Sequence, residues 1–123
     1  MKRGRSTNGP TLAEAAWLRM VKEAGCVCCA ARGYDREPGG PLAEAHRLLS
    51  GGIRRGHLHT VGLCAWHHRG RLIVTGWTHA THRRLLGPSL AEGSVPFHKA
   101  FGVDDALMAA THALIARQTS RAA

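Results

Sequence analysis

The chain has 123 residues, a net charge of +9 and an aromatic content of 5%. This length suits one small domain, and small domains with few large apolar residues are often reinforced by a metal ion or by disulfides. No apolar run is long enough to cross a membrane and no secretory signal is visible, so we expect a cytoplasmic protein. The charge favours an acidic partner, with nucleic acid as the first candidate and an anionic membrane surface as the second.

The positive charge is concentrated in the middle of the chain, where residues 45–91 contain no Asp or Glu. A solvated basic surface would explain this composition. However, charge of one sign around a cluster of histidines favours contact with phosphates. The candidate nucleic-acid-binding residues are Arg47, Arg54, Arg55, Arg69 and Arg71.

The N-terminal part predicts a flexible basic arm followed by a helix. Residues 1–10 are basic and rich in Gly, Ser and Asn. Thr11 and Glu14 then form a capping box for a helix that ends near Ala24, before a glycine. The apolar stripe that predicts the buried face of this helix consists of Leu12, Ala16, Met20 and Ala24.

The middle of the chain predicts strands. After a loop rich in Pro and Gly, residues 42–49 and 57–63 read as two strands, which a basic, glycine-rich connection joins into a hairpin with a long loop. Alternation along the first strand places Glu44 and His46 on one face. Residues 72–78 favour a further strand, because several are β-branched or aromatic.

The C-terminal part predicts two helices. Ser94 is the expected N-cap of a short helix that ends at Phe101, and Asp104 is the expected cap of a final helix over residues 105–118. We therefore divide the chain into a flexible arm at 1–10, a domain at 11–103, and a C-terminal helix and tail at 104–123.

Two pairs of metal-ligand residues predict a structural zinc site. Cys26 and Cys29 form a Cys-x-x-Cys pair, and Cys64 and His67 form a Cys-x-x-His pair. Tetrahedral zinc needs four such ligands, and a two-residue spacer lets one turn present both members of a pair. Cys28 could replace Cys29, and His68 could replace His67. Buried free cysteines would account poorly for the spacing.

The segments around these pairs resemble a known family, the HNH nucleases, and are most similar to the phage recombination-enhancement (Ref-like) nucleases. The shared segments are Glu44-Ala45-His46, Ser50-Gly51-Gly52, Gly56-His57-Leu58-His59-Thr60, Leu63-Cys64-Ala65-Trp66-His67-His68-Arg69-Gly70, Gly87-Pro88-Ser89-Leu90 and Pro96-Phe97-His98. The resemblance covers residues 25–102. It implies an α+β fold: a small zinc-stabilised ββα-metal finger, treble-clef-like, with flanking N- and C-terminal helices.

The resemblance also implies the site residues. His46 corresponds to the general base, and His59 and His68 correspond to residues that complete the catalytic site and hold its divalent ion, Mg²⁺ or Mn²⁺. His98 is a further candidate ligand for that ion. Many members carry a second histidine directly after the first, where this chain has Arg47. His57 could substitute for that missing histidine.

The expected activity is metal-dependent hydrolysis of DNA phosphodiester bonds. Such a reaction needs a base for the attacking water and a cation at the leaving oxygen, and neutral imidazole serves as a base near pH 7. We expect low sequence specificity, a role in phage or mobile-element recombination, and a recombinase filament as a candidate partner. No membrane or small-molecule cofactor is expected. The alternatives are a non-catalytic zinc module that binds DNA or protein, and a transition-metal sensor or store.

Overall fold

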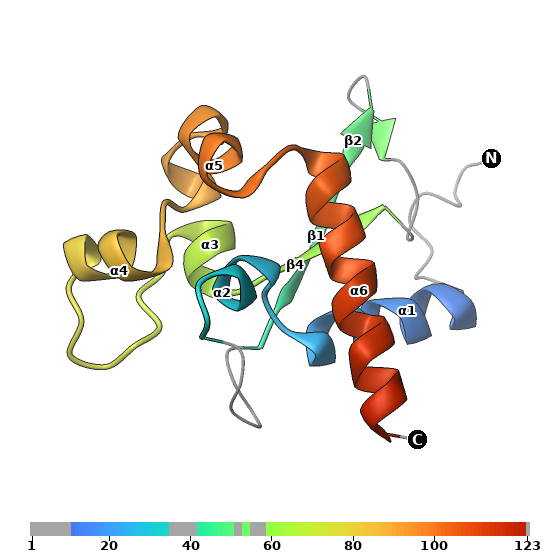
Figure 1. Ribbon diagram of the computed structural model, residues 1–123. Helices are drawn as coiled ribbons and strands as arrows, with labels where there is room; N and C mark the ends of the chain where they lie inside the picture. Colours follow the sequence, from blue (N-terminus) through green and yellow to red (C-terminus); the bar gives the residue numbers. More distant parts are fainter. Residues whose placement is uncertain (1–10, 35–41, 51–52, 55–58, 123) are drawn as a thin grey trace.

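The computed structural model describes residues 11–34, 42–50, 53–54 and 59–122, and in residues 49–50, 53–54 and 120–122 only the backbone (Figure 1). The predicted arm at 1–10, Arg55 and His57 lie outside the described residues. The elements in chain order are α1 (Leu12–Ala24), α2 (Val27–Ala31), β1 (Glu44–Arg47), β2 (Leu49–Ser50), β3 (Ile53–Arg54), β4 (Thr60–Leu63), α3 (Ala65–Arg69), α4 (His79–Leu86), the 3-10 helix η2 (Leu90–Glu92), α5 (Ser94–Phe101) and α6 (Asp104–Ala122).

The predicted hairpin is confirmed in a shortened form. Strands β1 and β4 pair in antiparallel orientation, with Glu44 opposite Leu63 and His46 opposite Val61. The connection contains a second small pair, in which β2 is antiparallel to β3. Because opposite residues of an antiparallel pair point to the same face, Glu44 and His46 share one face with buried Val61 and Leu63.

The helices cover this strand pair and enclose one small core. Figure 1 shows that α6 crosses the β1–β4 pair and that α1 lies beside the C-terminal half of α6. Packing is close at Gly62 in β4, where an added Cβ would lie 2.8 Å from the carbonyl oxygen of Gly25. The large buried side chains of the core include Leu48, Val61, Leu63, Trp66, Leu86 and Phe97, and α6 adds Leu107 and Leu114.

Helix α1 confirms the predicted capping box but not the predicted buried face. Thr11 accepts from the backbone N–H of Glu14, and the Glu14 carboxylate accepts from the backbone N–H of Thr11. Leu12, however, is 91% exposed, and Val21 is the buried residue of this helix. Of the predicted stripe, Ala24 packs against the core, but Met20 is exposed because Val21 faces β4 at Gly62 in its place.

The predicted strand at residues 72–78 is wrong. This segment is irregular and leads into α4, whose N-cap is Thr78. The backbone N–H groups of Ile73 and Val74 donate to Nε2 of buried His82, at 2.9 and 3.1 Å, and not to a neighbouring strand. A tertiary hydrogen bond therefore overrides the local strand preference.

The C-terminal helices form close to their predicted positions. Helix α5 ends at Phe101, but Ser94 is its first residue and not its cap, because Gly93 occupies the cap position without a side-chain bond. Asp104, the expected cap of the final helix, is likewise the first residue of α6 and not its cap, and the helix extends beyond the expected end to Ala122. In the described part of the chain, no helix is both long enough and apolar enough to span a membrane.

Candidate metal centre and histidine site

The four predicted zinc ligands come together in the core. The ligand atoms of Cys26, Cys29, Cys64 and His67 all lie within 4.8 Å of one another, and all four residues are buried. Cys26 and Cys64 are the N-caps of α2 and α3, so each pair sits on the first turn of a short helix. Cys28 is buried beside them but is not a member of this group.

The distances within this group suit one tetrahedral ion. The sulfurs of Cys29 and Cys64 are 3.7 Å apart, and Nδ1 of His67 lies 3.3 Å from the sulfurs of both Cys26 and Cys64. Zinc bonds of about 2.3 Å to sulfur and 2.0 Å to nitrogen would separate ligands of a tetrahedron by roughly 3.5 to 3.8 Å. The set of donors and its spacing therefore fit zinc.

The imidazole of His67 is oriented for this role by α4. Its Nε2 lies 2.6 Å from the carbonyl oxygen of Leu86, which can only accept, so Nε2 carries a hydrogen and Nδ1 is the ring atom that faces the sulfurs and could bind a metal. The next carbonyl, that of Gly87, accepts from the indole of Trp66 at 3.0 Å. The end of α4 thus holds two consecutive residues of α3.

The electrostatics of the group favour an ionised sulfur. Burial opposes ionisation of Cys26, but hydrogen bonds from the neighbouring thiols and from His67 outweigh it and lower the pKa of Cys26. Burial of the His67 imidazole is likewise outweighed by the Cys26 and Cys64 sulfurs, which raise the pKa of His67 to about 10. A metal ion bound here would displace the imidazole proton.

A second cluster lies on the outward side of the same turn, where His68 meets His46. The ring centroids of His46 and His68 are 5.2 Å apart. Nδ1 of His68 lies 2.8 Å from Oε1 of Glu44, and Arg69 donates to both oxygens of that carboxylate. The side chains of His68 and Glu44 are 26% and 32% exposed, so this cluster is open to solvent.

The environment of His46 keeps its imidazole neutral. Burial, followed by the repulsion that His68 exerts when both rings are protonated, lowers the pKa of His46. Asp104, at the start of α6, acts in the opposite direction and His98 in the same one. The structure therefore brings residues of β1, α3, α5 and α6 into one neighbourhood.

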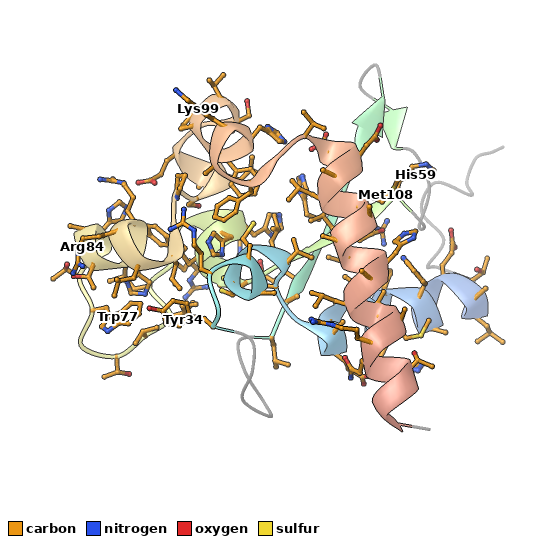
Figure 2. The ribbon with its side chains drawn as sticks, in the orientation of Figure 1. Tyr34, His59, Trp77, Arg84, Lys99 and Met108 are labelled. Carbon is orange, nitrogen blue, oxygen red and sulfur yellow. The ribbon has the colours of Figure 1, made fainter. Side chains whose placement is uncertain are left out.

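The other two predicted site histidines, His59 and His98, lie outside the His46–His68 pair. His59 lies just before β4, where its carbonyl accepts from the Leu48 N–H at 2.9 Å, and Figure 2 shows it at that end of the strand pair. Among the contacts of the described residues, no ring contact joins His59 to His46 or His68. The two nitrogens of His98 already bond Ser94 O at 2.9 Å and Asp104 Oδ1 at 2.8 Å. A metal ion at His98 would have to displace one of these partners.

The candidate DNA-binding arginines also differ in their surroundings. Arg69 is engaged with Glu44, Arg71 is exposed, and Arg47 is paired through its backbone with Thr60 on the face opposite His46. The side chain of Arg54 and all of Arg55 lie outside the described part of the chain.

Sequence reasoning did not assign a role to two carboxylates at this site. Glu44 could have been found, because it stands two residues before His46 and thus on the same strand face. Asp104 could not, because only the packing of α6 brings it near His46.

The fold and these clusters define a small α+β domain with a buried Cys₃His group that could hold a metal ion and a half-exposed pair of histidines beside it. The family model described as "Recombination enhancement, RecA-dependent nuclease" matches residues 10–116, so the chain belongs to this family. No curated protein and no solved structure matches the chain.

Proposed function

We propose that the protein is an HNH-type, metal-dependent DNA endonuclease. Strands β1 and β4 and helix α3 correspond to the two strands and the helix of a ββα-metal finger, with the Cys₃His group as its structural zinc site. The observation that carries the proposal is the contact between His46 of β1 and His68 of α3 at a half-exposed position. Membership of a family described as nucleases supports it.

In this proposal the two histidines have different tasks. His46 is the general base that takes the proton of the attacking water, and its lowered pKa keeps it neutral and ready near pH 7. His68 and His59 hold a divalent ion, with His98 as a further ligand if Asp104 releases it. Mg²⁺ or Mn²⁺ bound there would stabilise the charge that develops on the leaving oxygen.

The proposed general base, His46, occupies the first position of the pair His46-Arg47. Alternation along β1 turns Arg47 away from the face that carries His46 and Glu44. A second histidine at position 47 would therefore not have stood beside His68 in this fold. The arginine leaves the proposed base in place.

The proposed substrate is DNA, bound mainly through its phosphates. Arg71 is exposed and lies two residues after the end of α3, and the chain has a net charge of +9. Contacts of this kind carry little sequence information, so we propose low sequence specificity and binding that weakens steeply with salt. The proposed partner is a RecA filament on DNA, and the proposed setting is recombination in a phage or mobile element. The family description, which names recombination enhancement and dependence on RecA, supports the partner and the process.

The test is cleavage of DNA by zinc-loaded protein, measured on supercoiled plasmid and on single strands coated with RecA, with Mg²⁺, with Mn²⁺ or with EDTA. We expect wild type to nick DNA only with a divalent ion. His46→Ala and His68→Ala should each reduce the rate by about 10²- to 10⁴-fold, the range for loss of a general base. His112→Ala, an exposed histidine on α6, is the matched control and should retain full activity.

Two outcomes would contradict the proposal. Wild type that cleaves neither substrate with either ion is not a nuclease, and retained salt-sensitive DNA binding would then identify a non-catalytic zinc module. Activity that persists in His68→Ala but disappears in His112→Ala would place the catalytic site elsewhere.

A further inference from the structure

Glu44 connects the two elements that carry the proposed catalytic histidines. It is the first residue of β1, two positions before His46, and its carboxylate reaches across to α3. Oε1 lies 2.8 Å from Nδ1 of His68 and 3.0 Å from Nε of Arg69, and Oε2 accepts from the Arg69 guanidinium. One carboxylate thus holds two consecutive side chains of α3 against β1.

The hydrogen bond to His68 determines which ring nitrogen can bind a cation. An ionised carboxylate can only accept, so Nδ1 of His68 must carry the hydrogen. In the neutral ring the lone pair then lies on Nε2, the atom left for a metal ion. Histidines that bind metals commonly have such a carboxylate on the other nitrogen, where it fixes the tautomer and the ring orientation.

Arg69 holds the carboxylate in its turn. Its Nε and terminal nitrogen reach different oxygens of Glu44, a fork that fixes both the position and the plane of the group. Burial opposes ionisation of Glu44, but the bonds from Arg69 and His68 outweigh it and lower the pKa of this carboxyl. Glu44 therefore remains an acceptor at neutral pH.

We propose that Glu44 is a positioning residue of the nuclease site: it fixes His68 so that Nε2 is presented to the divalent ion, and Arg69 fixes Glu44. This proposal rests on the proposed function, because it assumes that His68 binds the catalytic ion. It gives Arg69 a structural task in the site, separate from the DNA contact expected from its charge.

The chain contains a matched control for the chemistry of Glu44. Glu92 of η2 accepts from Arg83 and lies 3.2 Å from Nε2 of His79, so it too joins a histidine and an arginine. This second trio lies on α4 and η2, outside the proposed site. Glu92→Gln and Glu44→Gln therefore remove the same charge from similar surroundings.

The experiment measures Mn²⁺ binding to zinc-loaded protein without DNA, by the electron paramagnetic resonance signal of free Mn²⁺. Zinc content and the melting temperature are recorded for each variant, and nicking is titrated with Mn²⁺. We expect Glu44→Gln to bind Mn²⁺ about 10- to 100-fold more weakly than wild type, the usual effect of removing such a partner. Excess Mn²⁺ should restore most of its nicking rate, while Glu92→Gln should match wild type.

Arg69→Met serves as a second variant, because it retains the bond between Glu44 and His68. A smaller loss of Mn²⁺ affinity is expected for Arg69→Met. If Glu44→Gln does not fold, the Mn²⁺ affinity of Arg69→Met tests the positioning role of Glu44. Unchanged Mn²⁺ affinity in a folded Glu44→Gln protein, with active wild type, overturns the role of Glu44 alone. Wild type that neither binds Mn²⁺ nor cleaves DNA overturns this role together with the proposed function.

Discussion

At the scale of single residues, neighbours in the sequence have different environments because short helices point their side chains in different directions. Cys28 and Cys29 are adjacent and both buried, yet only Cys29 belongs to the Cys₃His group. His67 and His68 are also adjacent, and His67 faces the core while His68 faces Glu44. About 100° of helical rotation between consecutive residues separates them.

This difference predicts the ligand set of the zinc site. Cys64→Ala removes one ligand, so the purified protein should lose its zinc and its cooperative thermal transition. Cys28→Ala removes a buried thiol outside the group, so it should keep one zinc per chain and lose only about 1–2 kcal/mol of stability. Elemental analysis and thermal melts check both. Zinc retained in Cys64→Ala would show that Cys64 is not a ligand, and zinc lost in Cys28→Ala would show that Cys28 is one.

At the scale of elements, the end of α4 supports the Cys₃His group through hydrogen bonds to α3. The carbonyls of Leu86 and Gly87 accept from the rings of His67 and Trp66. Gly87 also has a φ of 88°, and an added Cβ would lie 2.6 Å from the ring of Phe101. A glycine is needed here both for the backbone and for the close contact.

Gly87→Ala should therefore destabilise the protein more than the same change at Gly76. Gly76 has nearly the same φ, 89°, but no atom lies within 4 Å of an added Cβ, so Gly76→Ala measures backbone strain alone. We expect about 1–2 kcal/mol for Gly76→Ala and a further 1–3 kcal/mol of crowding for Gly87→Ala. Urea unfolding at saturating zinc gives both values. If both variants lose the same free energy of unfolding, the ring of Phe101 moves aside without an energetic cost.

At the scale of the whole molecule, the Cys₃His group is part of the hydrophobic core. The cluster of buried residues includes all four cysteines together with Leu63, Trp66 and Phe97, and α6 contributes Leu107 and Leu114 to it. A domain of this size has little other buried surface to compensate for the loss of a central group. The N-terminal helix, the strand pair and α6 should therefore unfold together.

Removal of zinc tests this dependence. A strong zinc chelator should abolish most of the helical circular dichroism at 25 °C, because apparent binding energies of about 10–16 kcal/mol for structural zinc exceed the stability of a typical domain. Adding zinc back should restore the spectrum, whereas Mg²⁺ should not. A spectrum and melting temperature that the chelator leaves unchanged would show that the core is stable without the metal.

The sequence was sufficient where the deciding interactions are local. The capping box at Thr11 and Glu14 and the end of α5 at Phe101, before Gly102, each depend on contacts within a few residues. The members of the Cys₃His group could also be predicted, because the two-residue spacing of each pair reflects the geometry of one helical turn. The family was visible in the segments around His46 and Cys64.

Tertiary structure decided what depends on distant partners. His82 draws the predicted third strand into an irregular segment, and the packing against β4 turns Val21 of α1 inward instead of Met20. The electrostatic environment of His46 also depends on tertiary structure, because only the placement of α6 across the sheet brings Asp104 near His46. By itself the sequence determined the members of the Cys₃His group, the capping box of α1 and the family, because each depends on residues that are close along the chain. The arrangement of Glu44, His68 and Arg69 needed the fold, because a strand and a helix must first be packed together.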